Sequence, residues 1–159
     1  MKNLMMAILA GAALVSAAGV QADDSAAASQ PAVSTKSVPQ LAVSADCSSC
    51  AEFSAALQSK VVAAYDEAAK ADGAEVKTDS VAQLKVSDFN KRSGGARFMG
   101  VLGGKDWIKG EVVYGNATSE VEDNARSSLF GIETVAENVG KQAYKNLAAQ
   151  ANSGADQAN

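Results

Sequence analysis

Apolar residues recur at spacings of three and four along one stretch in the first half of the chain, which is the period of one helix face. The stripe consists of Phe53, Leu57, Val61, Ala64, Tyr65 and Ala68. Ser49 and Glu52 match a capping box at its start, and Gly73 is a natural stop. We therefore expect a helix that begins at this box and ends before Gly73.

The same period returns near the end of the chain, over residues 131–149. Its members are Ile132, Val135, Ala136, Val139, Ala143 and Leu147. Gly140 weakens the middle of this second helix, because glycine has a poor helix propensity. Two predicted helices therefore bracket the folded part of the chain.

Between the two predicted helices the period changes toward two, which is typical of strands. Apolar and polar residues alternate over 82–86, and residues 96–102 form an apolar run. Residues 107–114 are rich in aromatic and β-branched side chains, and a short strand is expected over 118–122.

Turn residues separate these strands at hairpin spacing, in the segments 90–95, 103–106 and 115–116. The order of helix, strands and helix predicts an α+β fold. We expect an antiparallel β-meander of about four strands, packed by an N-terminal and a C-terminal helix. Both helices should cover one face of the sheet and leave the other face open to solvent or to a partner.

The first 22 residues have the pattern of an export signal. Lys2 supplies a positive start, residues 4–20 are uncharged and mostly apolar, and Val20-Gln21-Ala22 offers a small-x-small cleavage site. An uncleaved membrane anchor is the alternative, which the marginal length and the acidic residues that follow disfavour. We expect cleavage after Ala22, no lipid anchor and no transmembrane segment in the mature chain.

The rest of the chain divides into three parts. Residues 23–45 hold both prolines among small and polar residues, which predicts a flexible linker. Residues 46–150 are enough for a single α+β domain with one core. Residues 151–159 are again small and polar, so we expect a disordered tail.

The sequence contains no histidine. This excludes Ser/His/Asp and Cys/His catalysis in their usual forms, together with imidazole-bound zinc or haem. The formal net charge is −4, and −5 once Lys2 is removed with the signal, which argues against a nucleic-acid partner. No spacing singles out an acid–base pair of carboxylates, so we expect no catalytic residue, no metal and no cofactor.

Cys47 and Cys50 are separated by two serines at the expected start of the first helix, where a thiol pKa is lowered. This position favours a redox dithiol of the thioredoxin type. The chain has no proline after Pro39 to face such a pair and no recognisable βαβ unit, and Ala51 stands where a c-type haem site needs histidine. A structural disulfide formed after export is therefore our first interpretation, and a redox dithiol stays open as the alternative.

The segment 94–110 holds six of the 13 glycines. A phosphate-binding loop is excluded, because Met99 and Asp106 stand where that motif needs a glycine and a serine or threonine. The glycines instead indicate tight turns and close strand approach in a hairpin. We interpret Phe98 and Trp107 as core or edge aromatics.

Four side chains of this segment form a candidate partner-binding site: Arg97, Lys105, Trp107 and Lys109. The bases gather local positive charge on an otherwise acidic protein, so the partner would be an envelope protein or an anionic polymer. The alternative is that they pair with acidic neighbours, namely Asp88, Asp106 and Glu111.

Several short motifs occur together between residues 81 and 147. They are Leu84-Lys85-Val86-Ser87-Asp88-Phe89, Arg92, Gly95-Ala96-Arg97-Phe98-Met99-Gly100, Gly103-Gly104-Lys105-Asp106, Ile108 and Val135-Ala136. In this combination the chain resembles an uncharacterised family of bacterial envelope proteins, in which an Arg-bearing strand and a Gly-Lys turn precede the last β-hairpin. The resemblance implies a secreted or periplasmic α+β domain without an assigned reaction. Many relatives are lipoproteins, and the lack of an anchor cysteine here is a departure.

The sequence therefore predicts a periplasmic or secreted, non-enzymatic envelope protein that acts as an interaction module. The alternative is a dithiol redox factor of the cell envelope that uses Cys47 and Cys50. An enzyme that uses carboxylates is a third and weaker interpretation.

Overall fold

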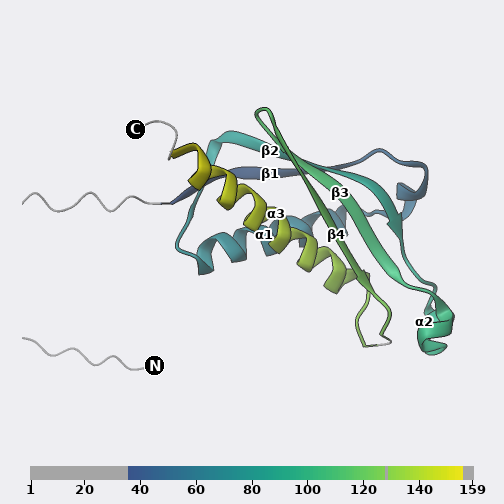
Figure 1. Cartoon of the computed structure of the whole chain (residues 1–159). Coiled ribbons are helices and arrows are strands. Elements are labelled where there is room, and N and C mark those ends of the chain that lie inside the picture. The colour runs from purple at the N-terminus through teal and green to yellow at the C-terminus, as the bar shows by residue number, and fades with distance from the viewer. Residues whose placement is uncertain (1–35, 128, 156–159) are drawn as a thin grey trace, which may run out of the picture. The chain divides into compact units, whose positions relative to one another are not determined.

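A four-stranded sheet and two long helices make up the fold of residues 36–127 and 129–155, which the computed structural model describes. The expected signal segment, 1–22, lies outside these residues. The sheet order is β1-β2-β3-β4, and both long helices lie on the same side of the sheet (Figure 1). The strands are β1 Ser37–Ala45, β2 Glu75–Asn90, β3 Asp106–Tyr114 and β4 Ala117–Ala125. The helices are η1 Ser48–Glu52, α1 Ala55–Ala71, α2 Gly94–Phe98, η2 Gly100–Gly103 and α3 Ile132–Ala155.

The α+β class is as predicted, but the sheet is mixed, so the purely antiparallel meander is wrong. β1 pairs with β2 in parallel, whereas β2 with β3 and β3 with β4 are antiparallel. Parallel neighbours need a crossover connection, which α1 provides. The chain therefore does contain a βαβ unit, β1–α1–β2, contrary to our expectation.

β1 occupies part of the segment that we predicted as a flexible linker. Its Val38 and Leu41 are buried in the core, and the Tyr65 hydroxyl of α1 donates a 2.6 Å hydrogen bond to the Pro39 carbonyl. Pro39 is tolerated because β1 is an edge strand with a register shift at this point. The small residues around these contacts give no strand pattern in the sequence, because β1 is stabilised by pairing with β2 and not by its own composition.

The apolar run 96–102, which we predicted as a strand, forms α2 and η2 instead. The connection between β2 and β3 is therefore a helical excursion rather than a tight hairpin. The next connection is a tight turn as predicted, with Gly115 at a φ of 58°. The sheet has four strands because β1 takes the place of the run that we misassigned.

The predicted helices are present, with different ends. Ser54 caps α1 by accepting a hydrogen bond from the Leu57 backbone N–H, so the predicted capping box at Ser49 is wrong. At its other end α3 continues to Ala155, into the segment that we predicted as a disordered tail. Gly140 lies where α3 crosses α1, because a Cβ there would approach the Val61 carbonyl oxygen to 2.2 Å.

The two faces of the sheet differ in polarity. Alternate residues of β2 and β3, such as Leu84, Ile108 and Val112, are buried under the helices. The opposite face carries polar side chains, and Lys109 on it forms an ion pair of 3.2 Å with Glu122 of β4. This open, charged face contributes little apolar surface.

Candidate functional site

The disulfide, a buried ion pair and several exposed apolar side chains lie at one end of the sheet. The strands β1, β2 and β4 end there and β3 begins there, so the connecting segments 46–54, 91–105 and 126–131 meet at this end. We call it the loop end; it lies beside the α2 label in Figure 1. The opposite end, with segment 72–74 and the turn at 115–116, we call the turn end.

Cys47 and Cys50 are joined as a disulfide directly after β1, with a Cα–Cα distance of 5.0 Å. Cys50 is buried and its sulfur lies 3.8 Å from the Val86 carbonyl oxygen, whereas Cys47 is half-buried. Cys50 lies in η1, a separate five-residue 3-10 helix of which Cys47 is the N-cap, and α1 begins at Ala55. The prediction that the pair sits at the start of the long helix is therefore wrong, and the helix dipole argument for a lowered thiol pKa loses its basis.

A carboxylate beside the disulfide is held by two donors. Asp88 accepts a hydrogen bond of 2.8 Å from the Trp107 indole N–H and one of 2.9 Å from the Ser49 hydroxyl. These two bonds, the indole's first, hold the pKa of Asp88 below its ordinary value. The Lys105 ammonium lies 5.4 Å from the centre of the Trp107 ring, within cation–π range. Asp88 is therefore a fixed, ionised acceptor that orients Trp107.

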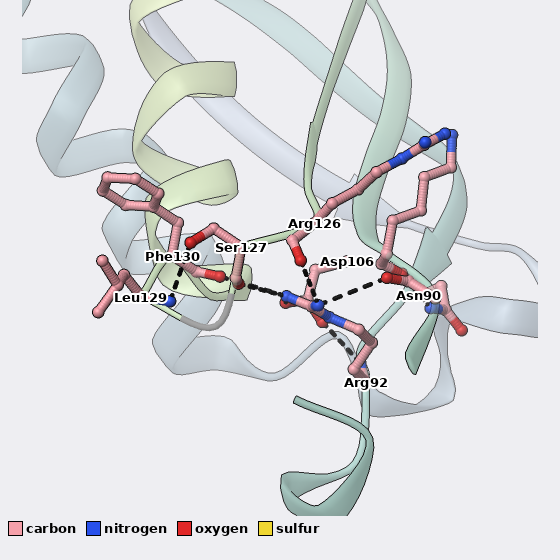
Figure 2. Close-up of polar contacts among 9 residues, drawn as sticks. Asn90, Arg92, Asp106, Arg126, Ser127, Leu129 and Phe130 are labelled. Atoms are coloured by element: carbon pink, nitrogen blue, oxygen red, sulfur yellow. Dashed lines mark hydrogen bonds and ion pairs between the residues drawn. The ribbon is translucent and has the colours of Figure 1, made fainter. Parts of the chain in front are cut away.

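The centre of the loop end is the Arg92–Asp106 ion pair, shown in Figure 2. The guanidinium binds one carboxylate oxygen at 3.0 Å and the Arg92 backbone N–H binds the other at 2.6 Å. Both side chains are almost fully buried, with 2% and 0% exposure. The guanidinium also donates to four backbone carbonyls, those of Gly104 at 3.4 Å, Arg126 at 2.9 Å, Ser127 at 2.9 Å and Phe130 at 3.3 Å. One side chain thus fastens segment 91–105 to segment 126–131.

The two fastened segments present large apolar side chains to solvent. Phe98 is 92% exposed, Leu102 is 87% exposed and Leu129 is 86% exposed, and Met99 and Phe130 are also exposed. The prediction that Phe98 is a core or edge aromatic is wrong, because Phe98 lies in α2, outside the sheet. We call these five side chains the apolar tips.

The four predicted partner-binding residues lie in β3 and in the segment that precedes it. Lys105 and Trp107 meet at the loop end, and Arg97 lies in α2. Lys109 lies on the open sheet face, where it pairs with Glu122, and Asp106 pairs with Arg92. The sequence analysis noted Arg92 as a motif residue but missed its role. The available signal was a base and an acid, Arg92 and Asp106, on either side of a glycine-rich segment.

The turn end carries a second, more exposed polar group. Asp72 accepts hydrogen bonds from the Lys36 ammonium and, at 2.5 Å, from the Tyr144 hydroxyl. The Lys36 contact, followed by that of Tyr144, lowers the pKa of Asp72. An open groove of about 570 Å³ beside Asp72 and Tyr144 runs between α1 and α3.

Among the described residues, no three His, Cys, Asp or Glu side chains are grouped so that they could hold a metal ion. Within the same part of the chain, no helix combines the length and the apolar character needed to cross a membrane. Comparisons of the chain with family models, with curated proteins and with solved structures found no match.

Proposed function

We propose that this chain is a non-enzymatic protein of the bacterial cell envelope, periplasmic or secreted, that binds another envelope component through its loop end. The observation that carries the proposal is the exposure of the apolar tips on two segments that a buried ion pair holds together. Soluble proteins rarely expose several large apolar side chains close to one another unless they bind something there.

Charge supports a negatively charged component. The three segments of the loop end contain five of the 14 Lys and Arg residues of the chain and two of its 18 Asp and Glu residues, Asp46 and Glu52. A basic end on an acidic protein attracts anionic partners and orients the protein toward them.

Export rests on the pattern of residues 1–22, which lies outside the described part of the chain, and a disulfide is compatible with an oxidising compartment. Intact-mass measurement on protein from the periplasm tests this directly. The expected mass lacks Met1 to Ala22 and carries no lipid. A mass that includes these residues, or a lipid, would overturn the assignment as a free periplasmic or secreted protein.

Binding through the loop end is tested by photocrosslinking in cells. A crosslinking residue at exposed Leu129 should give adducts with an envelope component, and the same residue at exposed Asn116 of the turn end is the matched control. Equal adduct patterns at the two positions would contradict a binding role for the loop end.

A redox role of the disulfide is the second candidate, and one observation favours it. Cys47 is half-buried whereas Cys50 is buried, an asymmetry that lets one sulfur be attacked first, and the Ser49 hydroxyl lies 3.4 Å from the Cys47 sulfur. The reduction potential separates the two functions, since structural disulfides usually lie below about −300 mV and exchange catalysts lie well above that value. Turnover in an insulin-reduction assay that Cys47→Ser abolishes would favour the redox role.

A further inference from the structure

We infer that the loop end is a membrane-binding surface, whose apolar tips enter the interface of a bilayer that contains anionic lipid. This inference rests on the proposed function, because it names the envelope component that the loop end binds. It assigns the surface to lipid rather than to a protein or a second copy of the chain.

The shape of the apolar surface fits a bilayer. The tips come from two separate segments, with Phe98, Met99 and Leu102 on one and Leu129 and Phe130 on the other. These side chains protrude individually and do not line a groove, since Phe98 and Leu102 have nearly their whole surface in water. A bilayer interface accepts isolated apolar side chains without shape complementarity, whereas a protein partner would need a matching surface.

The charges of the two segments that carry the tips complement anionic headgroups. Exposed Lys91 and Arg126 and half-buried Lys105 belong to the same two segments as the apolar tips, and no acidic residue lies in either segment. Each base close to an anionic membrane strengthens binding by about fivefold, and the attraction decays within a Debye length of roughly 8 Å at physiological salt.

The tips are held in place before any partner arrives. Arg92 fastens both segments through its bonds to Asp106 and to the four backbone carbonyls. Within segment 91–105, η2 packs so closely on α2 that a Cβ at Gly103 would lie 1.7 Å from the Ala96 carbonyl oxygen. The backbone of the two segments therefore loses little conformational entropy on binding, which favours affinity.

Vesicle binding tests the inference with two probes. Vesicles of phosphatidylcholine mixed in equal parts with phosphatidylglycerol should bind protein isolated from its host, and pure phosphatidylcholine vesicles should bind it much more weakly. Phe98→Ser combined with Leu102→Ser should weaken binding to the mixed vesicles by more than about tenfold, because two exposed side chains lose their apolar contact with the interface. Lys91→Gln, Lys105→Gln and Arg126→Gln together should weaken it by on the order of a hundredfold.

Matched substitutions at the turn end control for nonspecific effects. Val81→Ser with Tyr114→Ser removes two exposed apolar side chains far from the tips, and Lys141→Gln with Lys145→Gln removes two exposed bases. All four should leave vesicle binding unchanged. Every variant carries the same N-terminal segment, so differences among them report the described domain.

A fluorescent side chain at the tip reports insertion itself. With Trp107 replaced by Phe, a Phe98→Trp variant should shift its emission to the blue when mixed vesicles are added, and a Tyr114→Trp variant should not. The shift should weaken at high salt, because screening removes the headgroup attraction. No shift at position 98, or equal shifts at both positions, would overturn the inference.

The remaining outcomes separate this inference from the proposed function. If the wild-type protein ignores both vesicles while Leu129 still gives adducts that Asn116 does not, the lipid assignment fails and the loop end binds a protein or polymer. If the protein is a dimer that the tip substitutions dissociate, a second copy covers the tips and the lipid assignment also fails. If vesicle binding and the Leu129 adducts are both absent, both proposals fail.

Discussion

Both ends of the molecule join distant parts of the chain through a basic side chain and an aspartate, and they do so in opposite environments. At the loop end, Arg92 and Asp106 are 2% and 0% exposed. At the turn end, the side chains of Lys36 and Asp72 are 32% and 49% exposed. The same pair of charges therefore has two different roles.

The buried pair holds backbone segments together, whereas the exposed pair lies at an end that packing already holds. Arg92 satisfies carbonyls of two segments that have no strand or long helix of their own to hold them, so the segments depend on it. The turn end is already held by packing, since the rings of Tyr65 and Tyr144 lie 5.9 Å apart between α1 and α3. Water competes for Lys36 and Asp72 but not for the buried pair.

The largest effect is expected when the buried pair is broken. Arg92→Met should lower the free energy of unfolding by about 3–5 kcal/mol, because it removes the guanidinium that pairs with the buried Asp106 carboxylate and binds four backbone carbonyls. Urea unfolding measures the loss. Adding Asp106→Leu should recover part of it, since the buried carboxylate that lost the guanidinium is then replaced by an apolar side chain.

Exposed Lys91 is the matched control for this change. Lys91→Met removes a neighbouring base of similar length and should change stability by less than about 0.5 kcal/mol. An Arg92→Met variant that loses no more than this control would show that the two ends do not differ as described.

These differences also explain how far the sequence could be interpreted. The two long helices were predictable because each buries a repeating stripe, such as Val61 and Tyr65 in α1, and β3 was predictable from its β-branched residues. These elements carry their signal within a short window. Both helices on one face follow from such signals together with layer packing, whereas the count of four strands agrees only because β1 replaces the run 96–102.

The remaining elements depend on contacts that no local pattern reveals. β1 is a strand because β2 pairs with it and Tyr65 binds its Pro39, while its composition is that of a linker. The run 96–102 has the apolar residues of a buried strand, yet its Phe98, Met99 and Leu102 are exposed to solvent. Arg92 was noted as a motif residue, but its role needs segments more than 30 residues apart to meet, as in its bond to the Ser127 carbonyl.

A second prediction concerns the helix pair that spans the distance between the two ends. Gly140→Ala places a Cβ about 2.2 Å from the Val61 carbonyl oxygen, so α1 and α3 must move apart. The free energy of unfolding should fall by about 2–3 kcal/mol, as for other overpacked cores. Gly95→Ala, with no atom within 4 Å of the new Cβ, is the control and should be neutral or slightly stabilising. Equal effects of the two changes would contradict the close helix crossing.

A third and smaller effect is expected at the disulfide of the loop end. Replacing Cys47 by Ser and buried Cys50 by Ala should lower the free energy of unfolding by about 2 kcal/mol, because the closed loop is short. Reduction of the wild-type protein should give a similar loss, and Ser48→Ala, an exposed neighbour, should give none. Vesicle binding by the apolar tips should survive, since Arg92 rather than the disulfide holds them. Loss of that binding would mean that η1 supports the tips.

The smallest effect is expected for the exposed pair, and its pH dependence has a defined sign. The Lys36 contact and the Tyr144 hydroxyl lower the pKa of Asp72 in the folded state, so the folded state binds that proton less readily than the unfolded state. The resulting stability is present above the ordinary pKa of an aspartate and is lost as the pH falls through the lowered value. Asp72→Asn should therefore unfold slightly more easily than the wild type near neutral pH, by an amount that shrinks at high salt and vanishes in acid. The Arg92→Met loss should barely respond to salt, because water and ions do not reach that pair. Urea unfolding of both variants at low and high salt measures this contrast, and a salt response of equal size would show that exposure does not distinguish the two ends.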